Sequence, residues 1–152
     1  MVTLGILSST HSLRMARVSG TRFAPLWHPG LDTLKFPDLE DEGALLHALG
    51  KSVLAMLAEK PPAAIRLLKV VGSQHNHPLE IRVKVEGLLQ MLGARLSIPT
   101  SLVVPVALRN LEKKFDILTG SSPEDCLNGG KKFKSVDLRT AVLTGWFGLP
   151  ES

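Results

Sequence analysis

The feature that most constrains the fold is a change of pattern near Pro37. Before it, three short segments are apolar or alternate between apolar and polar residues, at positions 2–7, 13–18 and 21–27. Small polar residues and a glycine separate these segments, and Pro25 marks the third as short or as an edge strand. Short segments of this kind with tight turns between them predict an antiparallel meander of three strands.

After this meander, helical patterns alternate with short apolar runs. Asp41 and Glu42 place negative charge at the start of a helix, where the backbone dipole favours it. The apolar residues of that helix recur at intervals of three and four: Leu45, Leu46, Leu49, Val53, Met56 and Leu57. Pro61 and Pro62 end it. The apolar run at 64–71 then predicts a strand parallel to the first, because a helical crossover connects the two.

The same alternation continues to the end of the chain. The remaining elements expected are a helix at 78–93, a strand at 101–106, and helices at 107–115, from Ser122 onward and at 136–147 after the capping residue Ser135. We therefore predict an α/β fold with a mixed five-stranded sheet, made of the three-strand antiparallel meander and two parallel strands. Helices cover both of its faces, and residues 1–152 form a single domain.

The composition is that of a folded protein without membrane spans. Of 152 residues, 44% are hydrophobic and 21% are charged, a balance that is ordinary for globular proteins. No apolar run approaches the roughly 18 residues of a membrane span. The N-terminus shows neither the basic segment nor the cleavage site of a secretory signal. Since Cys126 is the only cysteine, no internal disulfide can form, and we expect a cytoplasmic protein.

Three segments carry a resemblance to a known fold. Residues 4–9 read Leu-Gly-Ile-Leu-Ser-Ser, residues 83–89 read Val-Lys-Val-Glu-Gly-Leu-Leu, and residues 135–141 read Ser-Val-Asp-Leu-Arg-Thr-Ala. With the order of elements, they resemble the ribonuclease H-like fold, and within it the branch of the Holliday junction resolvases. The layout is also similar to that of small bacterial proteins of uncharacterised function. The resemblance implies that these segments are the first strand, the helix after the fourth strand and the last helix.

The resemblance also implies a catalytic centre that this sequence does not complete. Enzymes of this fold use several carboxylates that converge on one or two magnesium ions. Leu7 and Ser8 stand where the first strand carries an aspartate, and residues 69–72 lack the expected glutamate. Asp137 is the one acid that aligns with a catalytic position. We therefore predict a catalytically inactive ribonuclease H-like domain that serves as a binding or assembly module. We expect no cofactor, since only an active nuclease would need Mg²⁺ or Mn²⁺.

A different metal site is an alternative. His75 and His77 follow the predicted fourth strand, at the end of the sheet where parallel α/β folds bind ligands. With Asp137 or His11 as a third ligand, they would hold a transition metal and support an atypical metal-dependent nuclease. The two histidines are also typical of a polar loop, and Asp137 is favoured in the first turn of a helix without any catalytic role.

A basic loop offers a further alternative, which is nucleic-acid binding without cleavage. Gly129 and Gly130 precede Lys131, Lys132 and Lys134, and the start of the last helix follows. Glycines, lysines and a helix start together can bind phosphate. Phe133 would either stack on an exposed base or, if this is only a solvated connecting loop, pack into the protein core. Lys113 and Lys114 are expected near this loop, and the formal net charge of +4 permits such binding without demanding it.

The remaining features have structural interpretations. Trp27, Trp146 and Phe147 are expected to be core residues or interface anchors. An exposed strand edge and this aromatic C-terminus predict a homodimer. Arg82 and Glu86 have the spacing of a surface ion pair on a helix.

Overall fold

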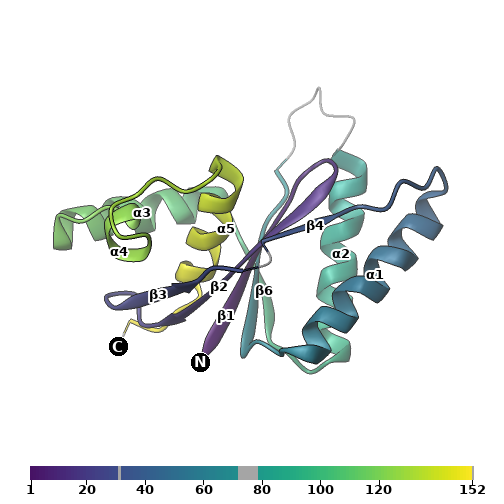
Figure 1. The fold of residues 1–152 in the computed structure, drawn as a ribbon, viewed down its shortest axis with the longest axis horizontal. Coiled ribbons are helices and arrows are strands. Elements are labelled where there is room, and N and C mark those ends of the chain that lie inside the picture. Colours follow the sequence, from purple (N-terminus) through teal and green to yellow (C-terminus); the bar gives the residue numbers. More distant parts are fainter. Residues whose placement is uncertain (31, 72–78, 152) are drawn as a thin grey trace.

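The computed structural model describes residues 1–30, 32–71 and 79–151 of the chain. The elements, in chain order, are β1 (Val2–Ser8), β2 (Ser12–Gly20), β3 (Pro25–His28), β4 (Thr33–Lys35), α1 (Glu42–Glu59), β5 (Ala64–Leu68), α2 (Leu79–Arg95), β6 (Thr100–Val103), α3 (Pro105–Thr119), α4 (Pro123–Leu127) and α5 (Val136–Phe147) (Figure 1). No helix in these residues is long and apolar enough to cross a membrane.

The strands form one mixed sheet in the order β3-β2-β1-β5-β6. β1 pairs with β2 in antiparallel fashion, with Ile6 opposite Met15. β1 and β5 are parallel, with Ile6 opposite Leu67, and β5 and β6 are parallel as well. The predicted α/β architecture is therefore confirmed, including the two parallel strands that follow helical crossovers.

The sheet has one strand more than the five expected. β3 pairs with residues 17–20 of β2, whereas β4 pairs with residues 12–14 of the same strand. Pro29 and Gly30 lie between β3 and β4, and Pro29 has no N–H to donate to a continuous ladder. The edge strand is therefore broken into two short pieces, and a hydrogen bond from the Met15 amide to the Asp32 carbonyl holds the segment between them against β2.

Local capping explains where several helices begin. The Asp41 carboxylate accepts a hydrogen bond from the Ala44 amide at 2.8 Å, and Ser135 accepts one from the Leu138 amide at 3.1 Å. Ser122 and Asp125 form a reciprocal capping box at the start of α4. The predicted starts of α1, α4 and α5 are confirmed.

Two helices are longer than their patterns predicted. α3 begins at Pro105, two residues before the predicted start, because proline is well suited to the first helical turn. It continues to Thr119, where Gly120 adopts a left-handed conformation with a φ of 66°. α2 runs past Gly93 to Arg95. A side chain at Gly93 would stand 2.0 Å from the Thr100 hydroxyl oxygen, so this glycine serves close helix–strand packing and not helix termination.

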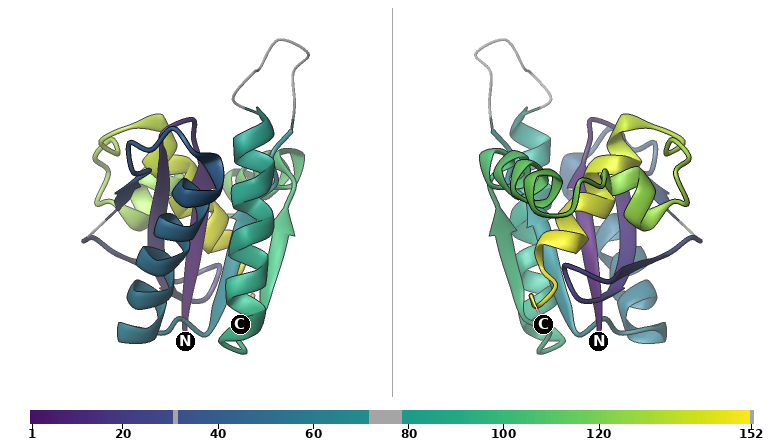
Figure 2. Two further views of the ribbon diagram at one scale, coloured as in Figure 1. Left: turned by 90° about the vertical axis from the view of Figure 1, so that its right-hand side faces the viewer. Right: turned by 90° about the vertical axis from the view of Figure 1, so that its left-hand side faces the viewer.

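The helices divide between the two faces of the sheet (Figure 2). α1 and α2 cover one face, where Leu4, Ile6 and Ile65 join their apolar residues in one buried cluster. α3, α4 and α5 cover the other, where Leu7 and Val18 belong to a second buried cluster. Because successive residues of a strand point to opposite faces, neighbouring positions of β1 contribute to different clusters.

Candidate functional site

α5 lies directly against β1 and β2 through contacts between glycine and backbone. A Cβ atom on Gly5 would stand 2.2 Å from the Ala141 carbonyl oxygen and 2.3 Å from the Gly145 nitrogen. Gly145 likewise approaches Val18 and the Gly5 nitrogen. This close approach fixes α5, whose first turn lies at the end of the sheet where β1 finishes (Figure 1).

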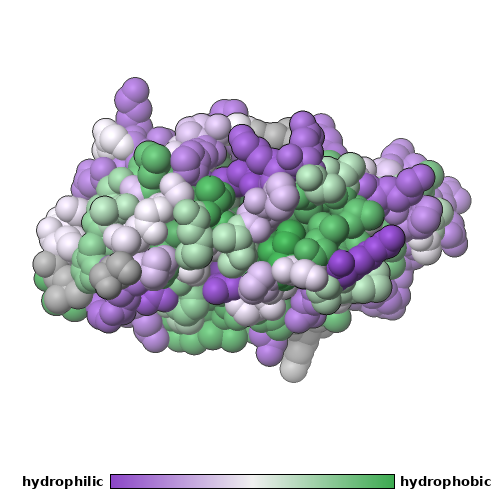
Figure 3. All heavy atoms as spheres, turned by 90° about the horizontal axis from the view of Figure 1, so that it is seen from below, coloured by the Kyte–Doolittle hydropathy of each residue, from purple (hydrophilic) through white to green (hydrophobic). Residues whose placement is uncertain are grey.

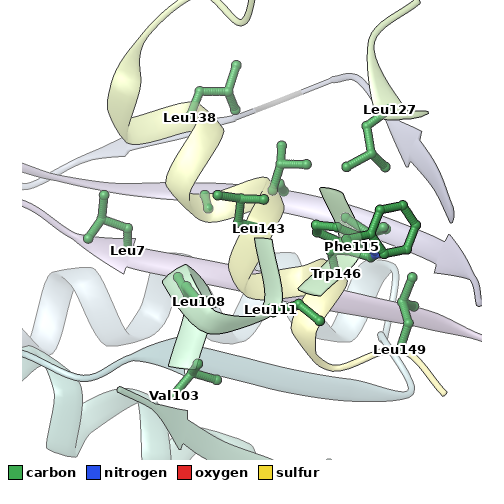
Figure 4. Packing of buried hydrophobic residues seen from close by; sticks show 14 residues of the cluster. Leu7, Val103, Leu108, Leu111, Phe115, Leu127, Leu138, Leu143, Trp146 and Leu149 are labelled. Carbon is green, nitrogen blue, oxygen red and sulfur yellow. The ribbon is translucent and has the colours of Figure 1, made fainter. Parts of the chain in front are cut away.

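Apolar side chains occupy the strand ends that face α5. Leu7 is only 8% exposed and belongs to the cluster that includes Leu138 and Leu143 of α5, and Figure 4 shows it among side chains from α3 and α5. Leu68 packs against the same cluster. Ile6 of β1 pairs with Leu67 of β5, and both point away from α5. The next residue of each strand points to the opposite face, so Leu7 and Leu68 lie side by side on the α5 face.

The polar backbone groups at this edge are bound by α2. The Arg82 Nε donates a hydrogen bond to the Ser8 carbonyl at 3.0 Å, and Glu86 accepts one from the Val70 amide at 2.8 Å. The ion pair expected between Arg82 and Glu86 is therefore replaced by two separate contacts with strand ends. Sequence reasoning missed this role because the four-residue spacing shows that the side chains share a helix face, but not what that face meets.

These residues do not fit a magnesium ion. Mg²⁺ prefers six oxygen ligands in octahedral geometry, including one or more carboxylates. Leu7 and Leu68 offer no ligand atoms, and Glu86 is engaged by a backbone amide. The buried hydroxyl of Ser8 has no hydrogen-bond partner in the part of the chain that the structure describes, but a single hydroxyl does not make a metal site. Within the same residues, no three His, Cys, Asp or Glu side chains converge.

Asp137 lies in the first turn of α5, two residues after the N-cap Ser135. A carboxylate is favoured there by the helix dipole. His11, proposed as an additional ligand, is exposed in the turn between β1 and β2. His75 and His77 lie outside the described residues, so the metal site built on them stays a prediction.

The basic loop between α4 and α5 has an ordered backbone. Gly129 and Gly130 both adopt positive φ angles, of 61° and 81°, which glycine tolerates at little cost. The side-chain amide of Asn128 donates hydrogen bonds to the carbonyls of Lys131 and Lys132, at 2.9 and 3.2 Å. The loop therefore presents its lysines from a fixed backbone.

Three lysines of this loop line one pocket. Lys131, Lys132 and Lys134 are exposed and surround a pocket of about 310 Å³, whose other wall includes Trp27 and Asp32. None of the three ammonium groups is ion-paired with a carboxylate among residues 1–30, 32–71 and 79–151. We call this feature the lysine pocket. Three uncompensated cations beside one carboxylate give it a net positive charge.

Phe133 points away from this pocket and into the protein. Its ring centroid lies 5.2 Å from that of Trp27, at an interplanar angle of 59°. The ring packs against the buried cluster between α5 and the sheet. Of the two interpretations of Phe133, the structure supports the core residue. Among the described residues, Trp27 and not Phe133 is the aromatic side chain that lines the lysine pocket.

Lys113 and Lys114 do not line the lysine pocket. Both lie on α3, where Lys114 is 3.6 Å from Glu151. Lys113 lines a separate hollow with Arg109 and Asp116. They therefore lie outside the pocket of the basic loop, and their role in phosphate binding stays a prediction.

Trp146 is a core residue and not an interface anchor. It is completely buried, its ring lies 4.5 Å from that of Phe115 in an edge-to-face arrangement, and its indole N–H donates to the Arg22 carbonyl at 2.9 Å. The Arg22 guanidinium lies over the Phe147 ring at 5.1 Å. The aromatic C-terminus is therefore covered by its own chain.

Arg139 connects α5 to the helices outside it. Its guanidinium forms ion pairs with Glu112 of α3 and Glu124 of α4. The hydrogen bond from Arg139 lowers the pKa of the Glu124 carboxyl, and the paired carboxylates raise the pKa of Arg139. This half-buried network holds α3 and α4 in place over the α5 face.

Solved structures with a similar fold include Holliday junction resolvases. The chain is similar to Thermus thermophilus RuvC in complex with a Holliday junction substrate, with a TM-score of 0.71 and 14% identity over 97% of this chain and 91% of the other. For the yeast mitochondrial resolvase Ydc2, the TM-score is 0.64 and the identity 17%, over 95% of this chain and 77% of the other. For the fowlpox virus resolvase in complex with Holliday junction DNA, the TM-score is 0.53 and the identity 12%, over 95% of this chain and 94% of the other. No protein-family model and no curated protein sequence matches the chain.

These similarities confirm the ribonuclease H-like fold that the sequence resembled. At 12 to 17% identity they show the fold alone. The functional interpretation therefore depends on the residues at the strand ends and in the lysine pocket.

Proposed function

We propose that this chain is a ribonuclease H-like domain that binds nucleic acid without cleaving it. The observation that carries the proposal is the contrast between two places. The strand ends that face α5 are filled by Leu7 and Leu68, whereas Lys131, Lys132 and Lys134 converge on one open pocket. Among the residues that the structure describes, the first place offers no set of metal ligands, whereas the second has three lysines and only one carboxylate, that of Asp32.

The lysine pocket suits a phosphate backbone. Lysine ammonium groups neutralise phosphates and release counterions, and this release supplies most of the sequence-independent affinity of nucleic-acid-binding proteins. Two of the solved structures with this fold are complexes with a Holliday junction substrate, which supports nucleic acid as the partner of this chain too.

The binding test measures the salt dependence of affinity. Fluorescence anisotropy of labelled four-way junction, duplex and single-stranded DNA is recorded at several salt concentrations. Replacing Lys131, Lys132 and Lys134 by alanine is expected to flatten the plot of log affinity against log salt by about 2 to 3, since each phosphate contact contributes about 0.7 to 0.9. Unchanged binding by this triple variant contradicts the proposal.

The double variant Lys113→Ala, Lys114→Ala is the matched control. It removes exposed positive charge from α3, outside the lysine pocket, and tests the predicted phosphate role of these two residues. A loss of slope similar to that of the loop variant would show that binding follows net charge and not the pocket.

The cleavage test uses the same substrates with Mg²⁺ or Mn²⁺, together with an RNA–DNA hybrid. No product is expected. Cleavage that disappears in Asp137→Asn would contradict the proposal and favour the nuclease with a site at His75, His77 and Asp137. For that alternative, metal titration should shift the histidine resonances and raise the thermal stability. Formation of a homodimer stays a separate prediction.

A further inference from the structure

A groove runs between α1 and α2, on the opposite face of the sheet from α5. α1 contributes Leu46, Gly50 and Leu54 to it, each four residues after the last, so that they follow one stripe of the helix. α2 contributes Leu88, Met91 and Leu92. The groove has a volume of about 260 Å³.

The charged and titratable residues that line the groove are all basic. They are His47 and Lys51 on α1 and Arg95 on α2, and no carboxylate from the described part of the chain lines it. Seen from below, apolar residues gather on the half of the molecule that carries α1 and α2, with hydrophilic residues beside them (Figure 3). The groove therefore combines an apolar floor with a cationic rim.

The groove is open because two glycines and two exposed apolar residues lie along or near it. Gly50 adds no side chain, and a Cβ atom there would only touch Leu88, at 3.5 Å. Met91 is 57% exposed, and Val83, farther along α2, is 49% exposed. A Cβ at Gly87, between these two, would meet nothing within 4 Å. Val83, Gly87 and Met91 are each four residues apart on α2, so the two exposed apolar side chains share one stripe of the helix. Exposed apolar side chains that gather in this way mark an interaction surface more often than isolated ones do.

We infer that this groove binds an amphipathic helix of a partner protein, with apolar residues at i, i+3 or i+4 and i+7 and with acidic residues on both flanks. The apolar side chains would enter between α1 and α2, which is the helix-in-groove mode of recognition. The acidic flanks would meet His47, Lys51 and Arg95, so charge complementarity selects the partner.

The charges argue against a second copy of this chain in the groove. A two-fold contact places the same surface patch on both sides of the interface. A contact centred here would bring the cationic rim of one copy against that of the other. A membrane surface fits the groove less well than a helix does. Leu92 at the floor is only 3% exposed, so a projecting side chain can reach it but a flat lipid surface cannot.

The test uses two designed, fluorescein-labelled helical peptides. Both carry leucines at i, i+3, i+4 and i+7; one has glutamates on the flanks and the other has lysines at the same positions. Anisotropy titrations are expected to show binding of the acidic peptide and at least tenfold weaker binding of the basic one. Met91→Glu should weaken binding of the acidic peptide at least tenfold, whereas Ile117→Glu, at an exposed apolar position of α3, should leave it unchanged.

A charge reversal makes the test independent of folding defects. The double variant Lys51→Glu, Arg95→Glu should lose the acidic peptide and gain the basic one. Equal binding of both peptides by the unmodified protein, or no gain on reversal, overturns the inference. So does a concentration-dependent dimer in sedimentation that Met91→Glu dissolves, or binding to anionic vesicles that the same change abolishes. Peptide binding should persist in the lysine-pocket triple variant, so this inference and the proposed function fail separately.

Discussion

The two faces of the sheet are covered in different ways. On one face, α5 touches the backbone of β1 through Gly5 and Gly145, and the enclosed cluster includes Leu7 and Trp146. On the other face, α1 and α2 pack through larger side chains, and Gly50 lies at an open groove between them. On one face, α5 approaches the sheet to backbone contact; on the other, a groove lined by apolar side chains opens between α1 and α2.

This difference shows where the chain can still interact. In folds of this kind, ligands bind at the carboxyl ends of parallel strands. Here that edge is closed from one side by the α5 cluster and from the other by the contacts of Arg82 and Glu86 with the strand ends. Accessible surface with a consistent chemical character lies elsewhere, in the lysine pocket and in the groove between α1 and α2.

The largest effect is expected from Gly5→Ala. The new methyl group would overlap backbone atoms of α5 at 2.2 and 2.3 Å, and backbone cannot move aside as a side-chain tip can. We expect a loss of about 4 kcal/mol or more in the free energy of unfolding, or failure to fold. Urea or thermal denaturation measures it.

Gly87→Ala on the other face is the control for Gly5→Ala. A Cβ there meets nothing within 4 Å, and alanine is the better helix former by about 0.5 to 1 kcal/mol. A small gain in stability is therefore expected. Equal tolerance of alanine at both glycines would show that the two faces do not differ in the way described.

Leu7→Asp tests the loss of the carboxylate at the end of β1. Burying an unpaired carboxylate among apolar side chains should cost about 3 kcal/mol near neutral pH. Burial raises the folded-state pKa of the new aspartate above its unfolded value of about 3.9, so the folded state holds the proton. The variant should then lose stability as pH rises from about 4 toward the raised pKa.

Leu7→Asn is the matched variant without a titrating group, and its stability relative to the original protein should not follow this pH dependence. Denaturation curves between acidic and neutral pH distinguish the two. If Leu7→Asp instead binds Mn²⁺ tightly and gains stability from it, the edge has kept enough other ligands for a metal, and the comparison of the two faces must be revised.

Arg139→Met should have the smallest of the three destabilising effects. Arg139 is half-buried with Glu112 and Glu124, so its removal should cost about 1 kcal/mol near neutral pH. The pKa of Glu124 is lowered by this contact, so its stabilising contribution is present above the ordinary glutamate pKa. It is lost as pH falls through the lowered value.

The difference in stability between Arg139→Met and the original protein should therefore shrink in acid. Lys84→Met is the control, because Lys84 contacts Glu42 and Glu80 in the open on the α1 and α2 face. It should change the stability less than Arg139→Met at neutral pH. A larger effect at Lys84 would contradict the view that the α5 face depends more on fixed contacts.

The sequence predicted those parts of the fold that depend on neighbouring residues. Asp41, Ser122 and Ser135 cap their helices by contacts within three residues, and the apolar stripe of α1 follows from its own period. The absence of an acid at Leu7 was equally visible in the sequence. These features need no knowledge of the rest of the chain.

The parts that could not be predicted depend on distant contacts. Gly93 resembles a helix end until Thr100 is seen against it, and Arg82 resembles a surface residue until it reaches the Ser8 carbonyl. The lysines of the basic loop could be recognised in the sequence, but not that Trp27, about a hundred residues earlier, would form the opposite wall of their pocket.

The broken edge strand has a consequence for assembly. A sheet edge is prone to join another sheet when it offers a long, regular row of free N–H and C=O groups. The β2 side of this sheet ends instead in four residues of β3 and three of β4, with Pro29 and Gly30 between them. Such an interrupted margin resists fibril-like stacking at high concentration. It also counts against a homodimer formed by strand addition at this edge of the sheet.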